Sequence, residues 1–180
     1  MLNEDTTEFD IRIKDNFFSK EDFNYIKNVS KKINFDALQI QYENNEKKNY
    51  HVFFTANAPK EICNIVYKRV SNFFKIKILD MRLCQYSLVA KSNTVEVHND
   101  KTENTNFQTI LYIDGNENIH CGTGFYTEKG KDNFELNSHI GFKPNRIVSW
   151  GSNVYHAPLS FTDSYTKRIS LITQYKIEEK

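Results

Sequence analysis

The sequence ILDMRLCQYSL at residues 78–88 begins a region in which short runs of β-branched and aromatic residues recur. Gly, Asn, Asp and Pro bound these runs, as expected for short strands joined by turns. We predict strands at residues 78–88, 94–97, 108–113, 124–127, 133–136, 147–150 and 168–175. Many short strands without helices between them favour two packed sheets, as in a β-sandwich or jelly roll.

Helical periodicity predominates upstream of this region. Ser19 is an expected helix N-cap, with Asp22 at the acidic position of a capping box, and an amphipathic segment follows. Pro59 stands near the start of a second periodic segment, which we expect to form a helix as far as Phe74. The fold class is therefore α+β, mainly β, with the helices packed on the outside of the β core.

The segment between the two expected helices contains two short predicted strands, at residues 38–42 and 51–55. The polar stretch 43–49 between them is expected to be a mobile loop and is our candidate lid over a site. The whole chain of 180 residues fits a single domain, with a helical part at about 1–75 and a β core at about 76–177.

Composition argues against several classes of function. The formal net charge is +1, which gives no basic excess for binding nucleic acid or an anionic membrane surface. The three cysteines, Cys63, Cys84 and Cys121, are widely separated, which favours reduced thiols in the cytoplasm over a disulfide framework. The acidic, polar N-terminus is not a signal peptide, and no apolar run has the length of a membrane span. We therefore expect a soluble cytoplasmic protein of unknown oligomeric state.

A candidate metal site begins with His98 and Asp100, which follow the strand-like run Val95-Glu96-Val97. Side chains two apart in a strand point to the same face, so an imidazole and a carboxylate lie side by side there. His156, which follows the predicted strand 147–150, is the expected third ligand. Two His and one carboxylate leave open positions on an octahedral metal, an arrangement typical of non-haem Fe(II) sites that use O₂.

A candidate anion receptor follows the distal histidine. Arg168 and Ser170 lie two residues apart in a predicted strand, so they share one face. A guanidinium fork beside a hydroxyl is suited to binding a carboxylate. The neighbouring Lys167 remains an alternative to Arg168.

The pattern H-x-D, a distal His and then R-x-S about a dozen residues later resembles the 2-oxoglutarate/Fe(II)-dependent dioxygenase superfamily, and its small prolyl-hydroxylase-like members most of all. The resemblance covers roughly residues 9–175. Further motifs that carry it are IKDNFFS at 13–19, CQYS at 84–87, TILYI at 109–113, GTGF at 122–125, PNRIVSW at 144–150 and HAP at 156–158.

The resemblance implies a double-stranded β-helix, the cupin-like form of the jelly roll. It implies that His98, Asp100 and His156 bind Fe(II), and that the far carboxylate of 2-oxoglutarate pairs with Arg168 and Ser170. Tyr86 or, as a weaker candidate, Tyr112 is expected to donate a further hydrogen bond to this co-substrate.

The implied reaction uses O₂ to hydroxylate a C–H bond of a peptide side chain, for example prolyl, or of a small molecule, with release of succinate and CO₂. Asp100 favours hydroxylation, since related halogenases usually lack this acid. Many prolyl hydroxylases of this type have Lys where this chain has Arg168, which points toward other branches. The alternative function is a non-catalytic, cupin-like module that binds a metal or another ligand.

Overall fold

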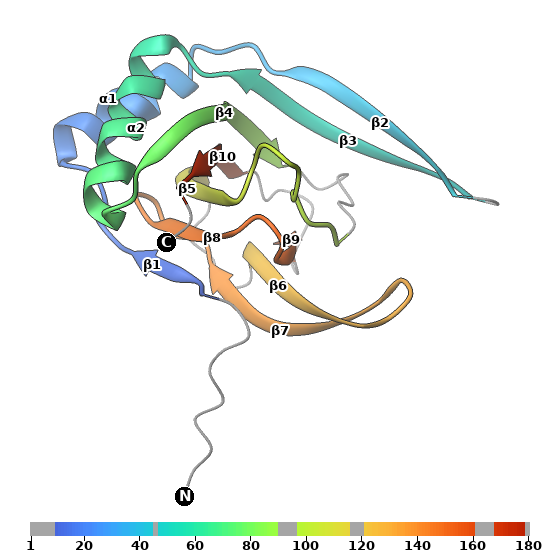
Figure 1. Ribbon diagram of the computed structural model, residues 1–180. Helices are drawn as coiled ribbons and strands as arrows, with labels where there is room; N and C mark the ends of the chain where they lie inside the picture. Colours follow the sequence, from blue (N-terminus) through green and yellow to red (C-terminus); the bar gives the residue numbers. More distant parts are fainter. Residues whose placement is uncertain (1–9, 45–46, 90–96, 116–120, 161–167, 179–180) are drawn as a thin grey trace, which may run out of the picture.

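The computed structural model describes residues 10–44, 47–89, 97–115, 121–160 and 168–178, with side chains described outside 37–53. Two helices and ten strands follow one another in the described chain (Figure 1). They are β1 (Arg12–Lys14), α1 (Lys20–Ser30), β2 (Asp36–Asn44), β3 (Lys47–Asn57), α2 (Lys60–Phe74), β4 (Ile78–Val89), β5 (Phe107–Gly115), β6 (Cys121–Gly130), β7 (Asn133–Gly141), β8 (Ile147–Gly151), β9 (Tyr155–Ser160) and β10 (Arg168–Ile177).

The strands form two antiparallel sheets. The large sheet has seven strands in the order β1-β8-β5-β10-β4-β3-β2, and the small sheet has three in the order β7-β6-β9. The chain crosses between the sheets repeatedly, for instance from β5 in the large sheet to β6 in the small one. This arrangement confirms the predicted fold class, mainly β with a jelly-roll core and few helices.

The helices pack on one side of the large sheet (Figure 1). The Ser19 hydroxyl accepts a hydrogen bond from the Asp22 backbone N–H at 3.1 Å, which confirms the predicted N-cap of α1. In α2, buried apolar side chains recur every four residues and form a single stripe: Ile62, Val66, Val70 and Phe74. Neither helix has the length and apolar character that crossing a membrane requires.

The large sheet separates two apolar clusters. The outer cluster lies between this sheet and the helices and includes Ile26, Val66, Leu111 and Leu171. The inner cluster lies on the other face and includes Tyr112, Phe125, Val148 and Trp150, contributed by both sheets. Alternate residues of β5 and β10 therefore belong to different clusters, as strand geometry requires.

Several predicted boundaries were wrong. The expected loop 43–49 is mostly strand, because β2 extends to Asn44 and β3 begins at Lys47; only 45–46 lie outside the described residues. Since β3 pairs with β4, and β1 with β8, the first 75 residues add three strands to the large sheet beside their two helices. The prediction missed β9, and predicted strand 94–97 lies, apart from residue 97, outside the described residues.

Candidate metal centre and anion site

Main-chain hydrogen bonds bring the H-x-D segment beside β9. The His98 N–H donates to the His156 carbonyl at 3.1 Å, and the His156 N–H donates back to the His98 carbonyl at 2.8 Å. The Asp100 N–H donates to the Ser152 carbonyl at 3.0 Å. The Asp100 carbonyl in turn accepts from the Thr105 hydroxyl at 2.8 Å. Backbone pairing thus places three side chains from distant parts of the chain together.

The ligand atoms of His98, Asp100 and His156 all lie within 4.8 Å of one another. Nε2 of His156 is 3.3 Å from one Asp100 carboxylate oxygen, and Nε2 of His98 is 3.9 Å from the other. Nδ1 of His156 lies 3.0 Å from the Val154 carbonyl, so it is the protonated nitrogen and Nε2 is the available ligand. Two imidazoles and one carboxylate fit a non-haem iron and leave the remaining positions open.

The electrostatics of this cluster favour an ionised carboxylate. Burial alone would raise the pKa of Asp100, but the hydrogen bond with His156 and the nearby imidazoles of His156 and His98 outweigh it and lower that pKa. The His156 side chain is 11% exposed and that of His98 is 36% exposed. The cluster is therefore open on the His98 side and enclosed on the His156 side.

Gln108 joins this cluster from β5, which the sequence interpretation did not foresee. Its side chain is 1% exposed. Its amide nitrogen donates to the Asp100 Oδ2 at 2.7 Å, and its amide oxygen accepts from the Trp150 indole N–H. The amide orientation follows from these contacts, because the reverse would set like groups against each other. A polar residue at an inward position of a buried strand was the signal available in the sequence.

Arg168 opens β10 and is buried, with 5% of its surface exposed. One guanidinium nitrogen donates to the Gly122 carbonyl, and the group lies 5.7 Å from the centre of the Tyr112 ring. Burial lowers its pKa, which the neighbouring Tyr112 opposes. Among the described residues no carboxylate forms an ion pair with Arg168, and its Nε has no hydrogen-bond partner. A buried cation of this kind fits an anionic ligand.

A row of hydroxyl side chains lies beside Arg168 on the inner face of the large sheet. Ser170 of β10 is directly opposite both Ser87 of β4 and Tyr112 of β5, and Ser87 is opposite Thr55 of β3. All four residues are buried, and within the described chain the Ser170 hydroxyl has no hydrogen-bond partner. The sequence interpretation named Ser170 and Tyr112 but missed Ser87 and Thr55, which become visible only through strand register.

The structure corrects the prediction for Tyr86. This residue is opposite Leu171, so it faces the outer cluster, and its hydroxyl donates to the Ile26 carbonyl of α1 at 3.1 Å. The register of β4 against β10 turns Ser87, not Tyr86, toward the inner face. Tyr86 is therefore withdrawn as a ligand of the co-substrate, and the alternative Lys167 lies outside the described residues.

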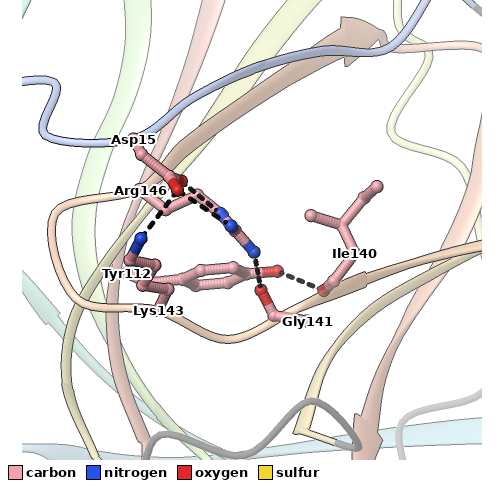
Figure 2. A network of polar contacts seen from close by, with 6 residues as sticks. All are labelled: Asp15, Tyr112, Ile140, Gly141, Lys143 and Arg146. Carbon is pink, nitrogen blue, oxygen red and sulfur yellow. Dashed lines mark hydrogen bonds and ion pairs between the residues drawn. The ribbon is translucent and has the colours of Figure 1, made fainter.

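A network of polar contacts connects Asp15, Arg146 and Lys143 beside Tyr112 (Figure 2). Arg146 and Lys143 both pair with Asp15, at 2.6 Å and 2.9 Å, and Arg146 donates to the Gly141 carbonyl at 2.7 Å. The Tyr112 hydroxyl contacts the Thr123 hydroxyl at 2.8 Å and the neighbouring Ile140 carbonyl at 3.3 Å. The network fixes the segment between β1 and α1 to the loop that leads from β7 into β8.

No protein-family model and no curated protein sequence matches this chain. Solved structures do match. A 2OG-Fe(II) oxygenase family oxidoreductase from Burkholderia pseudomallei has a TM-score of 0.68 at 12% identity, over 92% of this chain and 84% of that protein. A prolyl-4-hydroxylase from Pseudomonas putida has a TM-score of 0.62 at 10% identity, over 96% and 95%.

A third structure is a prolyl hydroxylase from Trichoplax adhaerens in complex with a peptide fragment of the hypoxia inducible factor oxygen degradation domain. It has a TM-score of 0.62 at 14% identity, over 92% of this chain and 82% of that protein. The sequence resemblance predicted this likeness. The chain has the fold of the 2-oxoglutarate/Fe(II) oxygenases and prolyl hydroxylases.

Proposed function

We propose that this chain is an Fe(II)- and 2-oxoglutarate-dependent dioxygenase that hydroxylates a C–H bond of a peptide side chain or a small molecule. The observation that carries the proposal is the convergence of His98, Asp100 and His156 within 4.8 Å. The fold and the buried Arg168 add support. A metal site that used no anionic co-substrate would not require a buried cation on the same face of the sheet.

In this proposal His98, Asp100 and His156 hold Fe(II), with Nε2 of His156 as a ligand because its Nδ1 is engaged by Val154. When bound, the iron and 2-oxoglutarate supply the oxidising chemistry, in which O₂ is consumed and succinate and CO₂ are released. The three protein ligands leave the other metal positions for the co-substrate and O₂.

Arg168 is proposed to pair with the far carboxylate of 2-oxoglutarate. Ser170 offers that carboxylate a hydroxyl donor, and Tyr112 provides the neighbouring buried wall. The apolar side chains of the inner cluster exclude water around the reacting atoms. The substrate reaches the cluster from the His98 side, where the ligands are more exposed.

The decisive experiment is the anaerobic addition of Fe(II) and 2-oxoglutarate to the purified chain, followed by exposure to air. We expect a weak visible charge-transfer band, then succinate. Asp100→Ala should remove both, with a loss of metal affinity beyond the roughly 10–100-fold that is typical of outer-shell changes. Asp80→Ala is the matched control, because Asp80 pairs with Arg82 on the surface at 2.9 Å.

Absence of both the band and succinate would contradict the proposal. Metal binding without either signal would instead favour the non-catalytic binding module. If the enzyme is active, mass spectrometry of peptide and metabolite pools for a product heavier by one oxygen atom would identify the substrate class.

A further inference from the structure

We propose that Gln108 and Trp150 form a relay that fixes the orientation of the Asp100 carboxylate before the metal binds. Both would act as positioning residues. The inference rests on the proposed function only in requiring a metal at the triad, and it needs no oxidation chemistry.

The relay has a defined polarity. The Trp150 indole nitrogen can only donate a hydrogen bond, so it turns the Gln108 amide oxygen toward itself. The amide nitrogen must then face the opposite way, where it donates to the Asp100 Oδ2 at 2.7 Å. This bond opposes rotation of the carboxylate about its own axis. The orientation of a metal ligand is thus set by a group that touches no metal.

Trp150 also contacts a second ligand. Its ring centre lies 5.0 Å from that of His156, with the planes inclined by 62°. Phe125 packs against the indole from another side, with ring centres 5.1 Å apart. One rigid aromatic side chain therefore restrains His156 directly and Asp100 through Gln108.

The strand register places both members of the relay. Gln108 of β5 is directly opposite Trp150 of β8, so the two side chains share the inner face. Gln108 is 1% exposed and Trp150 is 3% exposed. A buried amide without partners destabilises a protein, and here both of its polar ends are satisfied. The burial of a fully bonded amide beside a candidate ligand is typical of an outer-shell support.

Three variants of the full chain test the relay. Gln108→Met keeps the length of the side chain and removes both hydrogen bonds. Trp150→Phe keeps an aromatic ring beside His156 but removes the indole donor. Thr109→Val is the matched control, because it removes a buried hydroxyl contact of 2.6 Å with Thr173 on the opposite face of the same strand.

The probe is Co(II) alone, titrated under anaerobic conditions, with the dissociation constant and the visible absorption spectrum as readouts. Trp150 is the single tryptophan of the chain, so quenching of its fluorescence gives a second readout in every variant that retains it. Thermal melting of each metal-free variant monitors folding.

We expect Gln108→Met to weaken Co(II) binding by about 10–100-fold and to change the visible spectrum, because the carboxylate is no longer fixed. Trp150→Phe should weaken binding in the same direction but less. Thr109→Val should lower the melting temperature and leave both the dissociation constant and the spectrum unchanged.

Wild-type affinity and spectrum in Gln108→Met would overturn the relay, as would an equal loss of affinity in Thr109→Val. If Gln108→Met does not fold, Trp150→Phe decides, and unchanged Co(II) binding in that variant counts against the relay. The proposed function fails separately, if the wild-type chain does not bind Co(II) or if Asp100→Ala binds it as well as the wild type.

Discussion

The two faces of β5 and β10 differ sharply in what they bury. The outer face packs apolar residues, including Leu111 and Leu171, against the helices. The inner face buries Gln108, Arg168 and Ser170 among the apolar residues of the second cluster. The same two strands therefore contribute to a conventional core on one side and to polar sites on the other.

The comparison separates stability from function. Burying apolar side chains on the outer face stabilises the fold, whereas burying a cation or an unpartnered hydroxyl on the inner face opposes it. Ser170 and Leu171 are adjacent in the sequence, yet Leu171 stabilises the fold on the outer face, whereas Ser170 is a buried polar residue on the inner face. Substitutions of apolar residues on the outer face should thus lower stability without changing ligand binding, whereas substitutions of the buried polar residues on the inner face should weaken ligand binding without lowering stability.

Arg168→Met is expected to have the largest effect on the inner face. Co-substrate binding should weaken by about 2–5 kcal/mol, because the carboxylate loses its buried partner. The free energy of unfolding should stay the same or increase, since this buried cation pairs with no carboxylate of the described residues. Calorimetric titration with 2-oxoglutarate and denaturant unfolding would measure the two quantities. Unchanged affinity would assign the anion to another group, with Lys167 as the first candidate.

Leu171→Ala is the corresponding change on the outer face. The side chain is 1% exposed in the cluster beneath the helices, so its truncation should cost about 2–5 kcal/mol of unfolding free energy. Metal affinity should not change. Ser170→Ala changes the adjacent residue on the inner face and should show the opposite pattern, with weaker co-substrate binding and no loss of unfolding free energy. A reversed pattern between these neighbours would refute the division between the faces.

Tyr86→Phe tests the corrected position of this tyrosine. The loss of its hydrogen bond to the Ile26 carbonyl should reduce the unfolding free energy by about 0.5–1.5 kcal/mol. The affinity for 2-oxoglutarate should match that of the wild type, because the hydroxyl faces α1. Weaker co-substrate binding in this variant would contradict the correction and indicate that the Tyr86 hydroxyl contacts the co-substrate.

Asp15→Asn should have the smallest effect and should depend on pH. The hydrogen bonds from Arg146 and Lys143 lower the pKa of Asp15 well below its ordinary value. Protonation in the folded state is therefore disfavoured, so this stabilisation is present above about pH 4 and is lost as the pH falls further. The side chain is 34% exposed, which limits the effect at neutral pH to about 1 kcal/mol. Urea unfolding at several pH values should show the two proteins converging in acid.

The sequence predicted the general architecture because periodicity and turn residues report directly on local structure. It missed β9, since Pro158 interrupts the pattern there and cannot donate to a ladder. The structure explains why the proline is tolerated, because β9 lies at the edge of the small sheet. The hairpin of β2 and β3 was also underestimated, as its polar residues resemble those of a loop.

The convergence of His98, Asp100 and His156 could be predicted because their spacing forms a motif, whereas the residues around them could not. Whether Tyr86 or Ser87 faces inward depends on the register of β4 against β10, which is set by contacts between distant strands. Gln108 belongs to no motif, and its proposed role depends on Trp150, which lies opposite it on the neighbouring strand β8. Cys84, Tyr86 and Leu88 share one face of β4, and this apolar alternation was the cue that Tyr86 belongs to the core.

The paired hydrogen bonds between His98 and His156 have a consequence for the evolution of this chain. A slip of one residue in that short bridge would reverse which side chains of the H-x-D segment point at His156. The Thr105 hydroxyl, through its bond to the Asp100 carbonyl, helps to hold the alignment. A substitution in the turn at 102–105 should therefore displace the Asp100 side chain while all three residues of the candidate site are retained, so the presence of these residues alone is an incomplete criterion for an assembled metal site.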